Sequence, residues 1–230
     1  MAKDDLVQIT NKTKPSSVLR IITVLSFIAA FCGFLIAVAV QKTKGPIKNN
    51  QDLTLNNAIS EIIPNGKQVV TFELSDNDEI KLATNEVSAE KFYASYDDKG
   101  KLLGIAFRGY GQGYADQISI LFAYNPYDNT LIGIKVTDSK ETPGLGAKIV
   151  DDEDFLNNFK KMPLINDKNG EIHEIEIFNK NSSKKEPWQI NAIAGATISS
   201  RAVANILTQS GRRVIPLIKK NLKIFQNRGE

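Results

Sequence analysis

Cysteine and histidine are nearly absent from this chain of 230 residues, which holds only Cys32 and His173. One cysteine excludes a disulfide within the chain. One histidine excludes His-rich metal sites and the zinc motifs that combine several His or Cys side chains, so we expect no metal site. Any chemistry must therefore use other side chains or a bound cofactor.

A strong net charge is also lacking, because the formal net charge is only +3, with 24% charged and 42% hydrophobic residues. This composition excludes a disordered chain, and we expect no nucleic-acid partner. The charge is unevenly distributed, however: residues 1–48 carry +5, residues 211–230 carry +5, and the residues between them carry −7. An acidic body therefore lies between two basic ends.

One long apolar run is present, from Ile21 to Val40, with twenty residues and no charge. At about 1.5 Å per residue, it can span a hydrocarbon layer of about 30 Å. A cleaved signal peptide is the alternative, but the apolar region of a signal peptide has only about 7 to 15 residues. We expect a retained transmembrane helix at 21–40 after a cytoplasmic tail at 1–20, although basic residues on both sides make the orientation signal weak.

The next residues predict a linker and then a folded domain. Residues 41–51 lack apolar periodicity and contain Gly45 and Pro46, which is typical of a linker. Apolar residues at helical spacing predict a short amphipathic helix at 52–63. Strand-like runs separated by turn residues follow at 68–74, 79–83, 91–96, 102–107, 117–124 and 130–137. Their short connections favour antiparallel pairing.

The C-terminal part mixes helices with one strand. We expect a helix at about 146–160, a half-buried strand at 171–178, and helices at 199–209 and 213–225, with Pro216 in a first turn or at a kink. The fold class is α+β: one transmembrane helix followed by a single domain, at 52–210, of mainly antiparallel sheet with packed helices. Residues 211–230 predict a basic amphipathic helix that contacts anionic lipid or a partner subunit, or packs on its own domain.

Two segments could hold a ligand. In Asn191–Ser200, small residues permit a close backbone approach, and Thr197 stands where a helix begins, where unpaired N–H groups stabilise a phosphate. An ordinary Ser/Thr cap is the alternative. In Glu141–Gly146, the loop ETPGLG could bring backbone N–H groups and the Thr142 hydroxyl to a planar ligand, or could be a simple turn.

The two segments together carry a family resemblance. The run GYGQGYADQISILFAYNPYDNTLIGIKVTDSKETPGLGAKI, followed by NAIAGATISSRAV, resembles the FMN-binding domain of the G subunit of the Rnf electron-transport complex. The C subunit of the sodium-translocating NADH:quinone reductase shares the pattern. The resemblance implies an FMN whose phosphate is esterified by a separate flavin transferase to the threonine of the GAT motif. The implied cofactor-binding residues are Thr197, Glu141, Thr142, Gly144, Leu145, Gly146, Gly195, Ala196, Ser199 and Ser200.

The resemblance also implies a function. The chain would relay electrons within an ion-translocating Rnf-type complex that works between ferredoxin and NAD, with the other subunits as partners and no catalytic residue of its own. It would be a single-pass protein of the cell inner membrane with an extracytoplasmic domain. Asn191 and Ala194 depart from the Asp and the Ser or Thr usual in the attachment motif. The alternatives are the quinone-reductase subunit, a stand-alone membrane-anchored FMN protein, and an anchored structural subunit without flavin.

Three further features favour structural roles. We expect His173 on the surface and Trp188 in the core or at its rim. Gly109, Gly111 and Gly113 have the spacing GxGxG and no strand-turn-helix context, so they do not form a dinucleotide-binding fingerprint. Tyr110 and Tyr114 could border a flavin or could serve in packing.

Overall fold

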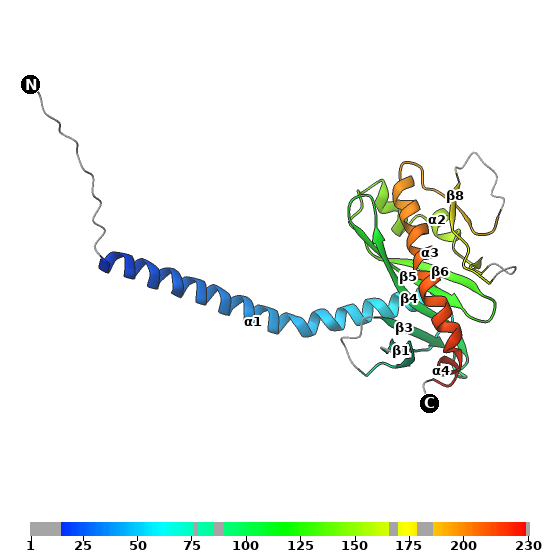
Figure 1. Cartoon of the computed structure of the whole chain (residues 1–230), viewed down its shortest axis with the longest axis horizontal. Coiled ribbons are helices and arrows are strands. Elements are labelled where there is room, and N and C mark those ends of the chain that lie inside the picture. The colour runs from blue at the N-terminus through cyan, green and yellow to red at the C-terminus, as the bar shows by residue number, and fades with distance from the viewer. Residues whose placement is uncertain (1–14, 76–77, 85–89, 166–169, 179–185, 229–230) are drawn as a thin grey trace, which may run out of the picture. The chain divides into compact units, whose positions relative to one another are not determined.

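The chain forms two compact units, Met1–Leu53 and Thr54–Glu230. The computed structural model describes residues 15–75, 78–84, 90–165, 170–178 and 186–228. Helix α1 (Pro15–Ile62) supplies the described part of the first unit (Figure 1). Within the described ranges, α1 is the one helix that is long and apolar enough to cross a membrane.

The residues predicted as a linker at 41–51 are helical, and the helix predicted at 52–63 is present but does not begin at residue 52. Helix α1 is continuous through both segments and includes Pro46. A proline inside a helix costs about 3 kcal/mol, but an established helix gains one hydrogen bond for each residue added. The side chains of residues 41–47 are exposed. An exposed helix needs no apolar stripe, so the spacing of apolar residues did not indicate the helix in this segment.

The second unit is built on a seven-stranded antiparallel sheet in the order β2-β1-β3-β4-β5-β6-β7 (Figure 1). The six predicted strands are present, and β4 extends further than expected. The strands are β1 (Gln68–Leu74), β2 (Ile80–Leu82), β3 (Lys91–Tyr96), β4 (Leu102–Gln112), β5 (Gln117–Asn125), β6 (Thr130–Asp138) and β7 (Met162–Pro163). The predicted α+β class is confirmed.

Each face of the sheet is covered by a helix. Successive side chains of a strand point to opposite faces, so each strand contributes to the packing on both sides. Ile105 and Phe107 of β4 belong to the main core, which includes the buried side of helix α3 (Thr197–Lys220). Ala106 lies on the other face, in a smaller cluster with Ile59 near the end of α1 and with Ile63. Because both faces are covered, the successive residues of a strand are buried on one side of the sheet or the other.

Two predicted elements between residues 146 and 178 are shorter than expected. The helix predicted at 146–160 is a 3-10 helix (η1, Gly146–Val150) followed by α2 (Glu153–Asn157), because the side chain of Asp152 accepts a hydrogen bond from the Phe155 N–H and starts a new helix. The strand predicted at 171–178 is reduced to β8 (Glu176–Phe178), which pairs in parallel with β9 (Gln189–Asn191).

The backbone N–H groups just before β8 donate hydrogen bonds to groups that do not belong to a neighbouring strand. The Ile175 N–H donates to the hydroxyl of Thr208 on α3 at 3.1 Å, and the His173 N–H donates to the Leu164 carbonyl at 2.9 Å. The ring of His173 is stacked on Trp188, with 3.7 Å between ring centroids. Both rings are half-buried, so the expected surface position of His173 is only partly met and Trp188 lies at the rim of the core.

The two C-terminal helices predicted at 199–209 and 213–225 are one long helix and one short one. Helix α3 continues through Pro216 to Lys220, and α4 (Leu222–Gln226) follows. Pro216 is exposed, while Ile215 and Ile218 on either side of it are buried, so core packing maintains the helix. The apolar side chains of this segment pack on their own domain.

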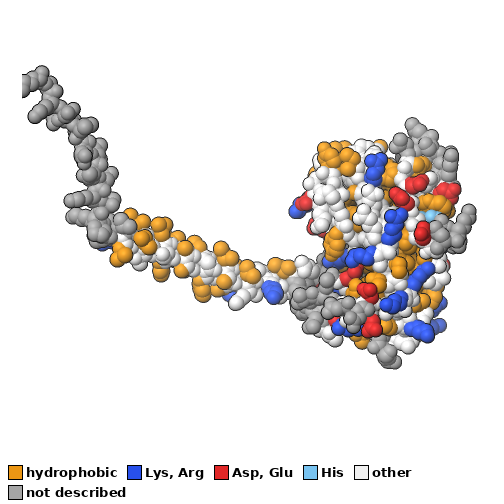
Figure 2. Space-filling model, in the orientation of Figure 1, with side chains coloured by type: hydrophobic (Ala, Val, Ile, Leu, Met, Phe, Trp, Pro, Cys, Tyr) orange, Lys and Arg blue, Asp and Glu red, His pale blue; other side chains and the backbone are white. Residues whose placement is uncertain are grey.

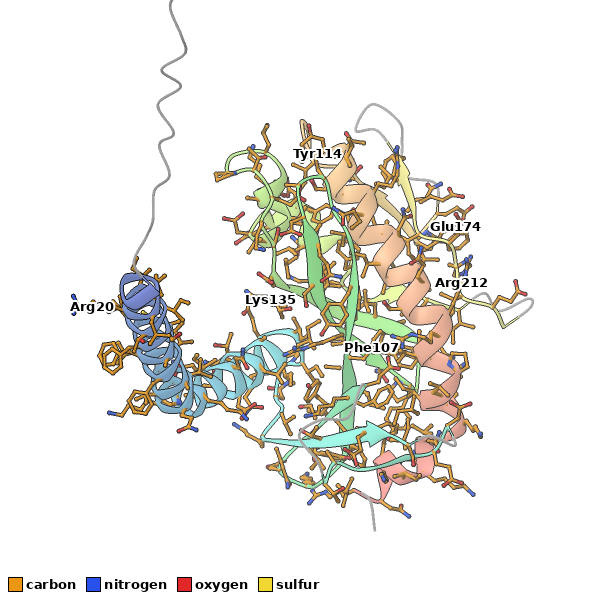
Figure 3. The ribbon with its side chains drawn as sticks, turned by 60° about the vertical axis from the view of Figure 1, so that its left-hand side comes forward. Arg20, Phe107, Tyr114, Lys135, Glu174 and Arg212 are labelled. Atoms are coloured by element: carbon orange, nitrogen blue, oxygen red, sulfur yellow. The ribbon has the colours of Figure 1, made fainter. Side chains whose placement is uncertain are left out.

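The exposed side of α3 and α4 is basic, and Figure 2 shows Lys and Arg side chains over the face that carries α3. Two of these side chains are paired with acids. Arg213 lies 2.7 Å from Glu90, and Arg212 lies 3.8 Å from Glu174 (Figure 3). Since the apolar side of this segment is buried, only its charged side is available to lipid or to a partner subunit.

Gly109 allows α3 to pack closely on β4. A Cβ at this position would lie 2.5 Å from the Ser210 hydroxyl and 2.6 Å from the Phe122 ring. We expect Gly109→Ala to lower the free energy of unfolding by about 1–3 kcal/mol through overpacking, measured by denaturant titration of the full chain in detergent. Gly133→Ala is the control, because its nearest neighbours would be 3.9 Å away. Equal stability of the two variants would contradict this account of the helix–sheet contact.

Candidate functional site

Three segments that are distant in sequence meet where α3 begins. They are the turn between β4 and β5 (residues 113–116), the loop at 141–146, and the segment at 191–200 that leads into α3. A Cβ on Gly195 would lie 3.4 Å from a methyl group of Leu145, so the second and third segments are in contact. Figure 3 shows Tyr114 of the β4–β5 turn beside the first turn of α3. The structure therefore brings together the ETPGLG and GAT motifs.

Glu141 lies at the centre of this junction, with its side chain inside the protein. The residue is 5% exposed. Its Oε2 accepts a hydrogen bond from the Ser199 hydroxyl at 2.5 Å, and its Oε1 accepts one from the Ala115 N–H at 3.0 Å. The carboxylate therefore joins all three segments and does not face the surface.

Ser199 and Ser200 also turn their hydroxyls inward. The Ser200 hydroxyl accepts a hydrogen bond from the Ile193 N–H at 3.1 Å and donates one to the Ala196 carbonyl at 2.9 Å. Both serines are buried. Ala196 occupies the N-cap position of α3, and no side chain caps the helix there. The predicted alternative of a simple Ser/Thr cap therefore does not describe this helix start.

Two glycines shape the surface of the site. Gly144 and Gly195 have φ angles of +77° and +80°, which side chains other than glycine rarely adopt. Gly144 closes a tight turn in which the N–H groups of Leu145 and Ala147 both donate to the Thr142 carbonyl at 3.1 Å. Both glycines are exposed. The backbone is therefore open to close approach from the solvent side.

Exposed hydroxyl and apolar groups surround the first residue of α3. The side chains of Thr142 and Thr197 are exposed. Leu145 is 50% exposed and Ile198 is 55% exposed, which is unusual for large aliphatic residues. The site thus offers an accessible threonine hydroxyl at a helix N-terminus, beside two aliphatic side chains whose outer sides are open to solvent.

Few charged side chains lie in the segments that form the surface of the site. Residues 109–115, 142–147 and 188–200 contain no charged residue. An exposed ion pair joins Lys140 to Asp116 at 2.8 Å at the edge of the site, and the hydrogen bond from Lys140 is the main reason that the pKa of Asp116 is lowered. The N-terminus of α3, a helix of 24 residues, contributes positive potential at the site through its dipole and its unpaired N–H groups.

The ten predicted residues are close together but divide into two groups. Thr142, Gly144, Leu145, Gly195 and Thr197 lie on the surface, and the other five are buried. Sequence reasoning missed Gly113 and Ala115, which contact Glu141 from the β4–β5 turn. The glycine run at 109–113 is the signal that could have found them, because closely spaced glycines also mark places where another segment packs against the backbone.

The two tyrosines of this region differ in their position. Tyr114 is exposed in the turn beside the site. Tyr110 lies on β4 between Gly109 and Gly111, both of which contact Ile206 of α3. Because side chains alternate along a strand, Tyr110 points to the face opposite α3. Of the two, only Tyr114 can border a ligand at the start of α3. Across the ranges given above, no group of three or more His, Cys, Asp or Glu side chains could hold a metal ion.

Comparison with known proteins shows what the region around the start of α3 is similar to. Residues 113–210 match the FMN-binding domain family. This range contains all three segments that meet at the start of α3.

Curated relatives extend the similarity to most of the chain. The G subunit of the ion-translocating oxidoreductase complex from Methanosarcina acetivorans is 29% identical over 188 residues, which cover 82% of this chain and 89% of the relative. The G subunit of the Na(+)-translocating ferredoxin:NAD(+) oxidoreductase complex from Acetobacterium woodii is 27% identical over 192 residues, covering 81% and 86%. The resemblance to the G subunit, predicted from the sequence, is confirmed.

Two solved structures share the fold. The crystal structure of NqrC from Shewanella oneidensis superposes with a TM-score of 0.55 at 20% identity, covering 73% of this chain and 86% of that one. The C subunit of the Na(+)-translocating NADH-quinone reductase from Parabacteroides distasonis gives a TM-score of 0.53 at 22% identity, covering 66% and 78%. At these identities, the likeness concerns the fold alone.

Proposed function

We propose that this chain is the FMN-carrying, electron-transferring G subunit of a membrane-bound ion-translocating oxidoreductase complex of the Rnf type. The observation that carries the proposal is the position of Thr197: its exposed hydroxyl is on the first residue of α3, between two loops of a domain that matches the FMN-binding family. The names of the relatives support the complex to which the chain is assigned.

The residues present fit FMN. A phosphodiester at Thr197 keeps one negative charge, which the N-terminus of α3 stabilises without a basic side chain. Exposed Gly144 and Gly195 leave room for backbone contact, and Leu145 and Ile198 offer apolar surface to a flat ring. FMN supplies the acceptance and release of electrons, so the protein needs only to bind and orient it. No acid, base or nucleophile from the chain is required for electron transfer.

We propose a covalent attachment made by a flavin transferase. The Thr197 oxygen forms a bond to the phosphorus of an activated FMN donor, while the bond from phosphorus to the donor's leaving group breaks and the hydroxyl proton is lost. No electrons are exchanged in this step. Asn191, where the motif usually has Asp, donates its backbone N–H to the side-chain oxygen of Asn158 at 3.2 Å, and Ala194 is exposed. Thr197 is itself exposed, so its hydroxyl is accessible in a chain that carries both departures from the motif.

The proposed setting is the cell inner membrane, with α1 as a single-pass anchor and the domain on the extracytoplasmic side. The exposed apolar residues of α1 support anchoring. Electrons would pass between ferredoxin and NAD through several subunits, of which this chain is one. As one subunit, the chain belongs to a translocating oxidoreductase and performs no independent catalysis. The fold shared with the quinone-reductase subunit makes that protein the second candidate.

Intact mass spectrometry tests the proposal directly. The full chain is expressed with and without a flavin transferase, and we expect a mass increase of one FMN only with the transferase. An unchanged mass would contradict the covalent attachment. Absence of flavin absorbance after incubation with FMN would contradict flavin binding as a whole and favour an anchored structural subunit.

A further inference from the structure

The buried carboxylate of Glu141 is the feature from which a further inference can be drawn. Family resemblance places this residue among those that line the flavin, but both of its oxygens are engaged inside the protein, with Ser199 and Ala115. A buried carboxylate without partners is costly. Here two donors from different segments compensate for the loss of water.

The packing around this carboxylate is adapted to it. A Cβ added to Gly113 would overlap Glu141 Oε1, and a Cβ added to Gly146 would overlap Oε2 and lie 2.7 Å from the Ser199 hydroxyl. Two positions without side chains therefore leave the space that the carboxylate fills. The β4–β5 turn, the 141–146 loop and the first turn of α3 converge on this one group.

We propose that Glu141 is a positioning residue for Thr197 and does not contact the cofactor. Ser199 lies two residues after Thr197 in the first turn of α3, so its bond to Glu141 fixes the rotation and depth of that turn relative to the 141–146 loop. Thr197 is thereby held beside Leu145 and Gly195. This inference rests on the proposed function, since it concerns the placement of the residue that would carry FMN.

Three substitutions separate geometry from charge. Glu141→Gln keeps the length and shape of the side chain: its Oε1 can accept from the Ala115 N–H, and its amide can donate to the Ser199 hydroxyl. Glu141→Asp keeps the charge but is one methylene shorter, so it cannot reach both partners. Glu141→Ala removes the group and leaves two buried donors without an acceptor. Positioning predicts that Gln resembles the wild type, whereas Asp resembles Ala.

The first measurement uses the full chain without flavin. Hydrogen exchange of the amides in residues 142–147 and 197–200 reports how firmly the segments are held. We expect exchange to be about ten- to a hundredfold faster in the Ala and Asp variants, as for loss of a buried hydrogen bond, and close to wild type in Glu141→Gln. Glu153→Gln, at an exposed carboxylate in the first turn of α2, is the matched control and should exchange like the wild type.

The second measurement is the visible circular dichroism of the flavin-loaded chain, which reports how rigidly a bound flavin is oriented. The signal should be reduced in Glu141→Ala and Glu141→Asp and preserved in Glu141→Gln. Exchange and dichroism of Glu141→Ala equal to wild type would overturn the inference, and so would a Gln variant that behaves like Ala. If wild-type protein binds no flavin at all, the proposed function fails, while the exchange experiment still tests the junction.

Discussion

Replacing Thr197 by alanine is expected to abolish flavin attachment completely while leaving the domain folded. The hydroxyl is the only atom of this side chain that can form the proposed phosphoester. Thr197 is exposed at the start of α3, and exposed substitutions usually change stability by no more than about 0.5 kcal/mol. The adduct is measured by intact mass and by flavin fluorescence in a denaturing gel, and the fold by thermal unfolding.

Two controls make this result specific. Thr142→Ala removes the other exposed threonine hydroxyl of the site and should leave the adduct in place. Thr197→Ser retains a hydroxyl and should still accept FMN. A fluorescent band that persists in Thr197→Ala and disappears in Thr142→Ala would move the attachment site to the 141–146 loop.

The largest loss of stability is expected from Phe225→Ala in helix α4. The ring is fully buried and makes edge contacts with Phe72 and Phe92, at centroid distances of 4.8 and 6.2 Å. Its backbone carbonyl accepts a 2.6 Å hydrogen bond from Tyr96, whose pKa burial raises to about 12. Truncating a buried phenylalanine to alanine typically costs about 3–5 kcal/mol, which denaturant unfolding would measure.

The neighbouring residue provides the comparison. Gln226 lies in the same helix and is exposed, so Gln226→Ala should change the free energy of unfolding by no more than about 0.5 kcal/mol. Similar unfolding midpoints for the two variants would mean that the packing of α4 against β1 and β3 does not stabilise the domain.

The strands were predictable because their signals are local. Turn residues mark each connection, and the runs between them are rich in β-branched and aromatic residues, as in β3 and β5. The helices at both ends were harder to predict. Pro46 and Pro216 indicated breaks, yet both lie inside helices. Helix propagation in the first case, and burial of Ile215 and Ile218 in the second, outweighed the local preference of proline.

The site was only half predictable from sequence. The two motifs were found by their pattern, and the helix start at Thr197 by its small residues. The direction of each side chain depends on long-range contacts. The local sequence therefore does not reveal that Glu141 and Ser199, which are 58 residues apart, form a hydrogen bond. The strand predicted at 171–178 failed for a similar reason, because Thr208 on α3 receives the Ile175 N–H that a strand partner would have received.

The exposure of Thr197 bears on the order of biogenesis. The threonine lies on the surface of the folded domain, and hydrogen bonds from Ser199 to Glu141 and from the Ile193 N–H to Ser200 hold the start of its helix. A transferase would therefore meet its acceptor after the chain has folded, and would recognise a finished surface rather than a short linear peptide.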